Sequence, residues 1–473
     1  MSTNTNNKRR YQKMDPISHI LKRPDMYCGS NRLRPNIEYV AQKEEDGYRI
    51  FRSEILSSPA ILRIFIEPLS NAIDNVERSR KTSTPCTKIK VSINMETGET
   101  SVWNDGDIIP IEMNEEERCY NHSMIFGQLL TGSNYDDEEE RVLSGRNGLG
   151  AKLTNVFSTH FSVKGCDPKN QKILKQNWVN NMQQTNGPEI KNTKLTKGYT
   201  QVTWIPDFSR FGLKDGYTQD IVNLYTRFIL DAAMLSKVKV YLNDEIIPIN
   251  SLADYARMYD TPTNENLYIK TNTSEVLLTP SREYETISFV NGVYTKLGGQ
   301  HVDAWSEELF RPIVNKFNGV TTKNTSSKKK KTTPKVNIGD IRNFFRLFVI
   351  STVVRPEFDS QDKNKLESPA IEAQVKQSHI NNILRWSVMD NIEEIIRAKE
   401  MVVLKKAERV TKKTRVDGLD PANKAGSKYG YKCSLFICEG LSAKTYVVAG
   451  IKEGVYGLLV VIGLEFYLLQ ERF

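Results

Sequence analysis

Polar side chains recur along one predicted helix in the N-terminal half of the chain. The segment IFIEPLSNAIDN places Glu67, Asn71, Asp74 and Asn75 on one helical face, and apolar side chains cover the rest. Carboxylate and carboxamide oxygens on one face suit holding Mg²⁺ and steering a water molecule. The alternative is a solvated face without a ligand, although such faces more often carry Lys, Glu or Arg than asparagine. Pro68 lacks an N–H group and is expected to kink this helix.

A glycine-rich stretch, SGRNGLGAK at residues 144–152, follows later in the chain. Two of its glycines have the spacing of a Walker A loop, but Ala151 precedes Lys152 and no Ser or Thr follows. The third glycine of a dinucleotide fingerprint is also missing. Its glycines and lysine can still turn N–H groups and charge toward phosphates, with a helix predicted to start near Ala151. We therefore predict a phosphate-binding loop of a less common type.

Two short polar turns lie between the helix and the glycine-rich stretch. Asn104-Asp105-Gly106 ends a predicted strand, where a side chain can present both a donor and an acceptor to a ligand. Gly132-Ser133-Asn134 reads most simply as a loop. Each signal alone is weak, but the order in which these motifs occur is a stronger signal.

Charge, cysteines and hydropathy bound the class of protein. Sixty-six basic and 57 acidic residues in 473 give a net charge of +9, a weak indication of a polyanionic partner. Six scattered cysteines form no C-x-x-C pair, so neither a zinc module nor a disulfide framework is indicated. The N-terminus lacks the apolar core of a signal peptide, and the apolar stretch 458–469 is too short to cross a bilayer. We expect a soluble intracellular protein.

Periodicity predicts a mixed α+β architecture. We expect helices at 59–76 and 220–235 and strands at 88–94, 201–205 and 237–242, the first strand continuing through METGET into a hairpin. This irregular alternation favours a mixed sheet with helices on one face. From Thr286 a strand, a glycine turn and a helix mark a second domain. The run SSKKKKTTPK (326–335) predicts a solvated loop, and 405–430 a linker before a third unit that begins at Cys433.

The order of these motifs resembles the ATP-binding fold shared by gyrase, topoisomerase II, heat-shock chaperone ATPases, MutL and histidine kinases. Longer blocks resemble the type IIA DNA topoisomerases of the eukaryotic kind. YQKMDPISHILKRPDMYCGS is similar to their N-terminal strap, IFGQLLTGSNYDD and GRNGLGAKLTNVFS to their lid, and SFVNGVYTKLGGQHVD and FDSQDK to their transducer. FICEGLSAKTYVVAG is similar to the opening of their Toprim domain. The resemblance spans roughly Tyr11 to Gly457.

The resemblance implies a domain plan and an active site. It implies a disordered tail (1–10), an ATP-binding α+β sandwich with its strap (11–260), a smaller α/β transducer (261–404) with a basic loop (323–335), a linker (405–432) and an incomplete Toprim start (433–473). It makes Glu67 the general base and Lys363 the residue that stabilises charge at the γ-phosphate. The implied ATP contacts are Tyr11, Asn71, Asn75, Asn104, Ser133, Asn134, Gly145, Arg146, Asn147, Gly148, Leu149, Gly150, Ala151, Lys152, Gln361 and Lys363.

Further roles follow from the same resemblance. Asn71 would bind Mg²⁺, Asn104 would recognise adenine, and Tyr11 would reach the nucleotide of a second subunit. Glu439 would belong to a Toprim metal site, and Lys328, Lys329, Lys330 and Lys331 would contact DNA. Where the family has glycine and aspartate, this chain has Ile108 and Leu441.

The implied function is the ATP-binding and ATP-hydrolysing dimerisation gate of a type II topoisomerase. Its cofactors would be ATP and Mg²⁺, and its partners double-stranded DNA, a second copy of the chain and a separate polypeptide with the cleavage domains. We expect a nuclear or other DNA-containing compartment and no DNA cleavage by this chain alone. Nothing after Gly457 resembles the family, so a truncated, split or frameshifted gene is expected. The alternative is a non-catalytic fragment that binds DNA or a full-length partner without turnover.

Overall fold

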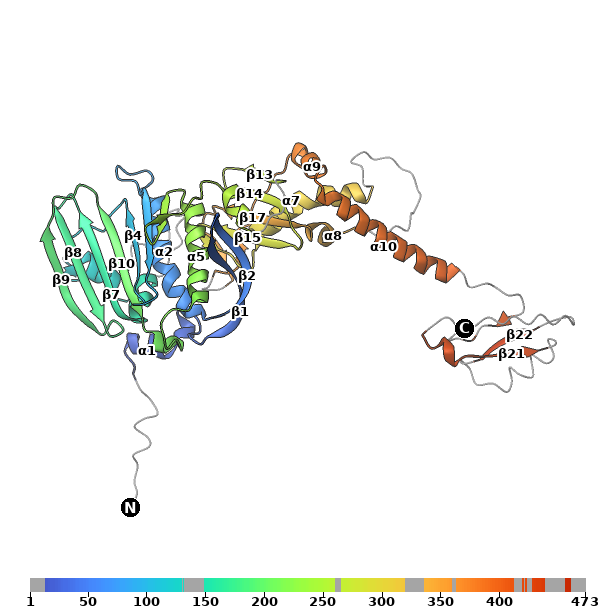
Figure 1. Cartoon of the computed structure of the whole chain (residues 1–473), viewed down its shortest axis with the longest axis horizontal. Helices are drawn as coiled ribbons and strands as arrows, with labels where there is room; N and C mark the ends of the chain where they lie inside the picture. Colours follow the sequence, from blue (N-terminus) through green and yellow to red (C-terminus); the bar gives the residue numbers. More distant parts are fainter. Residues whose placement is uncertain are drawn as a thin grey trace, which may run out of the picture. The chain divides into compact units, whose positions relative to one another are not determined.

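The computed structural model describes residues 13–129, 131, 149–259, 265–319, 336–359, 363–411, 419–420, 422, 428–438 and 456–460. The chain divides into two compact units, residues 1–326 with 335–392, and residues 327–334 with 393–473. The first unit contains an eight-stranded sheet and a five-stranded sheet (Figure 1).

An eight-stranded mixed sheet forms the centre of the N-terminal half. Its order is β12-β11-β3-β4-β10-β7-β8-β9, and every pair is antiparallel except β11 with β3. Alternation explains the pairing, because Ile89, Val91 and Ile93 of β3 are buried while Lys90 between them is exposed. The strands are β3 (Lys88–Ile93), β4 (Thr100–Asp105), β7 (Ser158–Asp167), β8 (Lys172–Val179), β9 (Gln184–Asn192), β10 (Tyr199–Pro206), β11 (Lys239–Leu242) and β12 (Glu245–Ile246).

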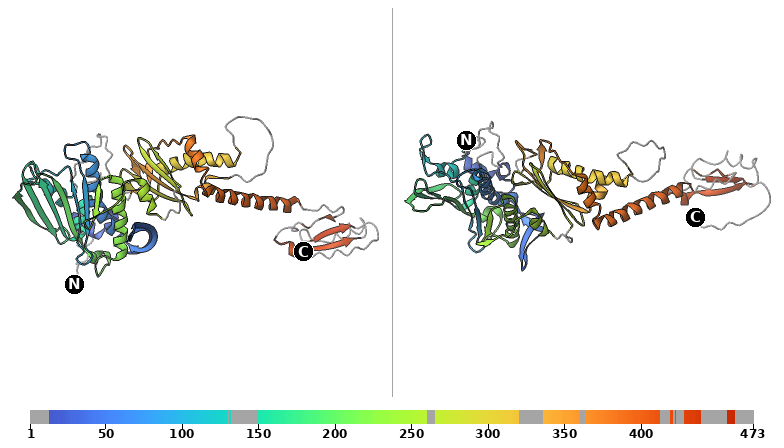
Figure 2. Two further views of the ribbon diagram at one scale, coloured as in Figure 1. Left: turned by 45° about the horizontal axis from the view of Figure 1, so that its top comes forward. Right: turned by 90° about the horizontal axis from the view of Figure 1, so that it is seen from above.

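Helices cover one face of this sheet (Figure 1; Figure 2). The longest are α2 (Pro59–Ser79) and α5 (Gln219–Ser236), with the shorter α3 (Asn121–Gly127) and α4 (Gly150–Val156) beside them. Ser58 caps α2 by accepting a hydrogen bond from the Ile61 N–H, and Pro59 stands at its first turn. Phe65 of α2 stacks on Tyr225 of α5 with ring centroids 3.9 Å apart. The predicted mixed sheet with helices on one face is confirmed.

The remaining elements of this half surround the layers. A long hairpin, β1 with β2, packs Val40 and Ile55 against Leu224 of α5. The other elements are α1 (Pro16–Lys22), η1 (Pro24–Met26), β1 (Arg34–Glu44), β2 (Gly47–Ser57), β5 (Met113–Asn114), β6 (Cys119–Tyr120), η2 (Phe208–Phe211) and α6 (Leu252–Arg257).

A second, five-stranded sheet follows in the order β13-β14-β17-β15-β16. One face of β17 turns Phe348 toward Tyr255 and Tyr259, and the other turns Phe345 toward Phe310 of α7. The elements are β13 (Leu267–Lys270), β14 (Ser274–Pro280), β15 (Glu285–Val290), β16 (Val293–Tyr294), α7 (Gln300–Phe317), α8 (Ile338–Arg342), β17 (Phe345–Ser351), β18 (Glu357–Phe358), β19 (Leu366–Ser368) and α9 (Gln377–Ile383). The predicted strand, glycine turn and helix after Thr286 are confirmed.

A buried polar pair on α5 lies where the two sheets share one core. The Arg227 Nε lies 3.2 Å from Asp231 Oδ2, and the guanidinium lies 3.9 Å from the ring centroid of Tyr294. Tyr255 donates a 2.5 Å hydrogen bond to Asp231 and lies 2.7 Å from the hydroxyl of Tyr259. Burial raises the pKa of Asp231 to about 6, although the Arg227 charge opposes this. Removing one partner of such a pair is costly, because the other charge stays buried.

A second charged cluster, formed by Glu285 of β15 and Arg346 of β17, lies in the same region. The Arg346 Nε donates a 2.5 Å hydrogen bond to Glu285, and its Nη1 donates a 2.8 Å hydrogen bond to the carbonyl of Tyr259. Tyr39 of β1 donates to the other oxygen of Glu285. The first hairpin, the segment after α6 and the second sheet are thereby joined by directional bonds as well as by apolar packing.

The second unit is small in its described residues. The helix α10 (Val388–Thr411) enters it from the first unit and runs past residue 405, where the predicted linker begins. A three-stranded sheet follows in the order β20-β22-β21, built from β20 (Leu419–Asp420), β21 (Ser434–Cys438) and β22 (Tyr456–Val460), with η3 (Gly430–Lys432) before β21. Among the described residues, no helix is both long and apolar enough to cross a bilayer. The run 326–335 lies outside the described residues.

Pro68 lies inside α2 without ending it, and the kink that its position predicts stays a prediction. The helix continues from Pro59 to Ser79 with Pro68 inside it. Because proline has no N–H, the carbonyl of Ile64, four residues earlier, loses its helical donor. The Thr154 hydroxyl of α4 donates a 2.9 Å hydrogen bond to this carbonyl, and Thr154 is fully buried. One side chain of α4 thus replaces the missing backbone donor and ties α4 to α2.

Replacing Thr154 with valine should lower the free energy of unfolding by about 1–3 kcal/mol, because it leaves the buried Ile64 carbonyl without a donor. Urea denaturation followed by circular dichroism measures this change. In a Pro68→Ala background the backbone N–H at position 68 is restored, so Thr154→Val should cost clearly less. An equal cost in both backgrounds would show that Thr154 does not compensate for Pro68.

Candidate functional site

The carboxylate of Glu67 lies between two groups from different elements. Its Oε1 is 3.4 Å from the Arg63 Nη1, one turn earlier on α2, and both side chains are largely shielded from water. Its Oε2 lies against Gly150, the first residue of α4, where an added Cβ would be only 2.0 Å away. A side chain at position 150 would displace the carboxylate from this place. The predicted base and the end of the predicted phosphate loop are therefore neighbours.

Lys152 lies in the first turn of α4 with almost no exposed surface. Its side chain is 2% exposed, and its Nζ donates a hydrogen bond to the carbonyl of Thr131. Thr131 in turn donates its hydroxyl to the carbonyls of Met124 and Gln128 at the end of α3, each at 2.9 Å. Burial lowers the pKa of Lys152 to about 8, since the charged ammonium loses hydration. An anionic ligand beside this amine would restore the favourable environment for its charge.

Two side-chain anchors fix α4 in place. Thr154 binds the carbonyl of Ile64 on α2, and Asn155 donates a 2.9 Å hydrogen bond to the carbonyl of Phe126 on α3. The phosphate-loop helix is thus held by its two neighbours through buried hydrogen bonds, which makes Lys152 part of a rigid framework.

Asn75 and Asn104 converge on the turn at the end of β4. Both donate to the carbonyl of Asp105, at 3.1 and 3.0 Å, and Asn75 also donates to the carbonyl of Asp107 at 3.1 Å. The Arg78 Nη2 donates a 2.9 Å hydrogen bond to the Asn75 Oδ1. Asn75 therefore braces the turn from α2, and the nucleotide contacts predicted for both asparagines remain predictions.

The turn itself depends on Gly106 and Asp105. Gly106 has a φ of 103°, and an added Cβ would lie 2.7 Å from the backbone of Cys86. The Asp105 carboxylate accepts hydrogen bonds from the Thr87 and Lys88 N–H groups at 2.7 and 2.9 Å. Burial alone would raise the pKa of Asp105, but the bonds from Thr87 and Lys88 outweigh it and lower the pKa. Ile108, at the position of the family's second glycine, packs against Gly198.

Other predicted residues are placed singly or lie outside the described residues. Asn71 is exposed on α2 one turn after Glu67, and Lys363 has a left-handed φ of 56°. Leu149 and Ala151 flank Gly150 at the start of α4. The predictions for Tyr11, Ser133, Asn134, Gly145, Arg146, Asn147, Gly148, Lys328, Lys329, Lys330, Lys331, Gln361 and Glu439 lie outside the described residues.

The residues present fit a nucleotide with Mg²⁺. The described part of the chain contains no group of three or more His, Cys, Asp or Glu side chains that could hold a metal by itself. Mg²⁺ commonly takes only one or two protein oxygens and fills its shell with waters and phosphate oxygens. Glu67 and Asn71 offer such oxygens one turn apart, and the dehydrated Lys152 amine suits phosphate.

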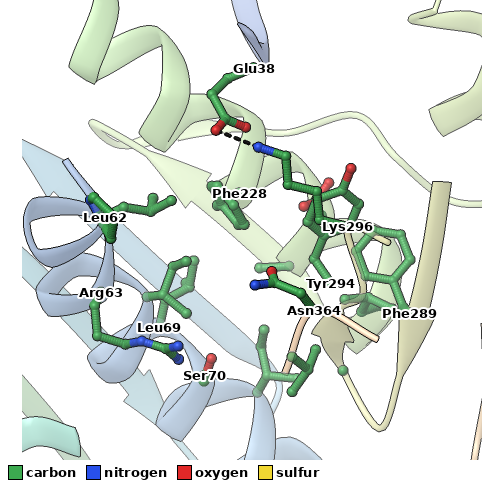
Figure 3. A pocket seen from close by; sticks show the side chains of 18 of the residues that line it. Glu38, Leu62, Arg63, Leu69, Ser70, Phe228, Phe289, Tyr294, Lys296 and Asn364 are labelled. Atoms are coloured by element: carbon green, nitrogen blue, oxygen red, sulfur yellow. Dashed lines mark hydrogen bonds and ion pairs between the residues drawn. The ribbon is translucent and has the colours of Figure 1, made fainter. Parts of the chain in front are cut away.

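A separate cavity of about 290 Å³ lies between α2, β1, α5 and the β15–β16 hairpin (Figure 3). Glu38 and Lys296 form an ion pair of 2.6 Å at its wall, and Leu62, Ile73 and Phe289 supply apolar lining. None of the residues predicted to bind nucleotide lines it, but Arg63, the ion-pair partner of Glu67, does.

The chain is similar in sequence and in structure to several known proteins. Residues 234–417 match the DNA gyrase B family. DNA topoisomerase 2 of Invertebrate iridescent virus 6 is 38% identical over 95% of this chain and 41% of its own length. The crystal structure of the ATPase region of Saccharomyces cerevisiae topoisomerase II superposes with a TM-score of 0.72, at 33% identity, over 81% of this chain and 98% of that one. The chain belongs to the type II DNA topoisomerase family.

Other relatives of the family agree with this assignment. DNA topoisomerase 2 of Candida albicans is 35% identical over 98% of this chain but only 32% of its own length. The chain therefore spans about two fifths or less of these curated topoisomerases, and it matches the region that contains their ATPase part. The ATPase domain of Thermus thermophilus gyrase B, at 18% identity and a TM-score of 0.51, shares the fold alone.

Some residues of the site were not predicted from the sequence. Arg63 precedes Glu67 by four positions, a spacing that predicts an ion pair on a helix, so a signal for it was present. Thr154 and Thr131 act through contacts with segments 90 and 21 residues away in the chain. Nothing in the local sequence points to those contacts.

Nucleotide affinity should depend on pH through Lys152. With a pKa of about 8 this amine is protonated at neutral pH, and a bound phosphate would favour that form. Affinity for a non-hydrolysable ATP analogue should therefore be flat below pH 8 and fall by up to about tenfold per pH unit above it. Titration calorimetry from pH 7 to 9.5 measures this fall. Lys152→Met should weaken binding and abolish the dependence, whereas Lys175→Met, on the exposed face of β8, should leave both unchanged.

Proposed function

We propose that this chain binds MgATP between α2 and α4 and hydrolyses it as the ATP-operated gate of a type II DNA topoisomerase. The observation that carries the proposal is the contact between the Glu67 carboxylate and Gly150, which sets a base beside the start of the phosphate-loop helix. The match to 98% of the yeast ATPase region supports it.

In this proposal the chain's own residues position and activate a water molecule. Glu67 orients the water and takes its proton as the water oxygen bonds to the γ-phosphorus and the bond to the β–γ bridging oxygen breaks. Asn71 would hold Mg²⁺, and the ion would supply neutralisation of charge on the phosphate oxygens. Lys152 binds phosphate oxygens from its shielded position. Lys363 stabilises the charge that develops as the γ-phosphoryl departs.

The partners of the gate are proposed from the family and the sequence. Tyr11 completes the nucleotide site of a second copy of the chain, so ATP binding favours a homodimer. Lys328 to Lys331 contact the phosphates of double-stranded DNA, and cleavage domains on a separate polypeptide complete strand passage. These roles assign the protein to a DNA-containing compartment.

The alternative of a non-catalytic fragment is favoured partly by Pro68, which is expected to kink the helix that carries Glu67. In the structure α2 is continuous through Pro68, and Thr154 satisfies the freed carbonyl. This continuity supports Glu67 in the role of base, so we favour hydrolysis over the non-catalytic alternative.

Replacing Glu67 with glutamine should reduce ATP turnover at least about 100-fold, because the amide cannot accept the proton of the attacking water. Affinity for the nucleotide should stay within about threefold. Phosphate release and binding of a fluorescent ATP analogue provide the two measurements. Glu77→Gln, in an exposed pair with Arg80 on the same helix, should behave as wild type. Normal turnover in Glu67→Gln would remove Glu67 from the role of base, and an inactive wild-type chain would contradict the proposed hydrolysis.

Replacing Lys328, Lys329, Lys330 and Lys331 together with alanine should reduce the stimulation of ATP hydrolysis by duplex DNA, since fewer phosphates are neutralised. The slope of the logarithm of DNA affinity against the logarithm of salt concentration should decrease in magnitude by up to about four, one for each lysine removed. Basal hydrolysis without DNA should not change. An unaltered DNA response and salt slope would identify the run as a solvated loop without a DNA contact.

A further inference from the structure

The ion pair between Arg63 and Glu67 is more shielded from water than two other ion pairs spaced i,i+4 on the described helices, although less than the buried Arg227–Asp231 pair. Its two side chains are 17% and 25% exposed. In the pairs Arg311–Glu307 and Arg397–Glu393, every side chain is about half exposed or more. Shielding from water strengthens a charge interaction, because fewer water dipoles screen it. The Arg63 guanidinium therefore acts on Glu67 more strongly than the same spacing would at an open surface.

The two oxygens of Glu67 face different surroundings. Oε1 is 3.4 Å from the Arg63 Nη1, whereas Oε2 lies against Gly150 at the start of α4. The space above Gly150 exists only because the residue has no Cβ. Contact with Arg63 on one oxygen and with Gly150 on the other restricts rotation of the carboxylate about its terminal bond, which is otherwise broad and roughly two-fold.

We propose that Arg63 is a positioning residue for ATP hydrolysis: by binding Oε1 it leaves Oε2, on the side of Gly150, as the oxygen that accepts the proton from the attacking water. The proposal rests on the function proposed above, in which Glu67 is the base. When the proton reaches Oε2, Oε1 becomes the carbonyl oxygen of the acid and still accepts a hydrogen bond from Arg63. The charge and hydrogen-bonding pattern of Arg63 are the same before and after the transfer.

The location of Arg63 makes a purely structural role a poor explanation. Its side chain lines the cavity of about 290 Å³ between α2 and the β15–β16 hairpin, and Figure 3 shows it pointing along that wall. It is not among the buried residues that form the core. A shorter or uncharged side chain at position 63 would enlarge an existing cavity rather than open a hole in the apolar core. Loss of Arg63 should therefore affect the orientation of Glu67 more than the fold.

The test uses the full chain and three substitutions of Arg63. Arg63→Met removes the charge and the donors, and it should lower kcat for ATP about 10- to 100-fold, because a misplaced base loses much of its effect. KM and the Kd for a non-hydrolysable analogue should change less than threefold. Arg63→Lys keeps a charged donor and should recover at least half of the loss on a logarithmic scale. Arg80→Met, in an exposed pair with Glu77, should leave kcat unchanged.

A double-mutant comparison separates positioning from general damage. In a Glu67→Gln background, Arg63→Met should cause little further loss of the residual rate, because the two residues act as one unit. Normal kcat in Arg63→Met, no recovery in Arg63→Lys, or a full additional loss in the Glu67→Gln background would overturn the proposal. If Arg63→Met fails to fold by its thermal midpoint, Arg63→Gln and Arg63→Lys decide through the ratio of their kcat values, which positioning predicts to favour lysine.

Failure of this inference is distinguishable from failure of the proposed function. A wild-type chain that binds but does not hydrolyse ATP would contradict the function itself. A chain that hydrolyses ATP, loses activity in Glu67→Gln and keeps it in Arg63→Met would contradict only the role of Arg63.

Discussion

One missing backbone donor governs how the site is assembled. Pro68 lies one residue after Glu67 and leaves the carbonyl of Ile64 without its helical partner, and the Thr154 hydroxyl supplies the hydrogen bond instead. Because Thr154 is on α4, this bond holds the phosphate-loop helix against α2. Gly150, four residues earlier, then lies against the Glu67 carboxylate, which an added Cβ would displace. This bond, together with the one from Asn155 to the carbonyl of Phe126, sets the spacing of base and loop.

The sequence predicted those parts of the molecule whose signals are local. Alternation predicted β3 and its hairpin with β4, and the apolar stripe predicted α2 with Glu67 and Asn71 on its polar side. The sequence predicted a helix through Pro68, but the hydroxyl that compensates for the proline could not be predicted, since Thr154 lies 90 residues away from Ile64 in the chain. The shielding of Lys152 by Thr131 depends on the same kind of distant contact. The helix α10 passed the predicted linker start because a basic composition does not by itself stop a helix.

The two sheets of the first unit share one core, and this bears on how a nucleotide site can influence the rest of the protein. Phe289 and Phe348 of the second sheet pack in the same apolar cluster as Phe65 of α2, and Glu285 is held by both Tyr39 and Arg346. A close-packed interior transmits displacement because it has few voids to absorb it. The cavity beside Arg63 is one described place where this continuity is interrupted.

The buried pair of Arg227 and Asp231 also limits how this protein can change over generations. A substitution that removes either charge leaves the other isolated, at a cost of about 3–5 kcal/mol, a large share of the 5–15 kcal/mol that keeps a typical domain folded. Replacing both with apolar residues of similar volume can be neutral, but the two changes seldom arise together. A chain that carries only one of the two changes would fold poorly. The pair should therefore persist even where an apolar pair would be equally stable. Relatives that lack one member should lack the other as well.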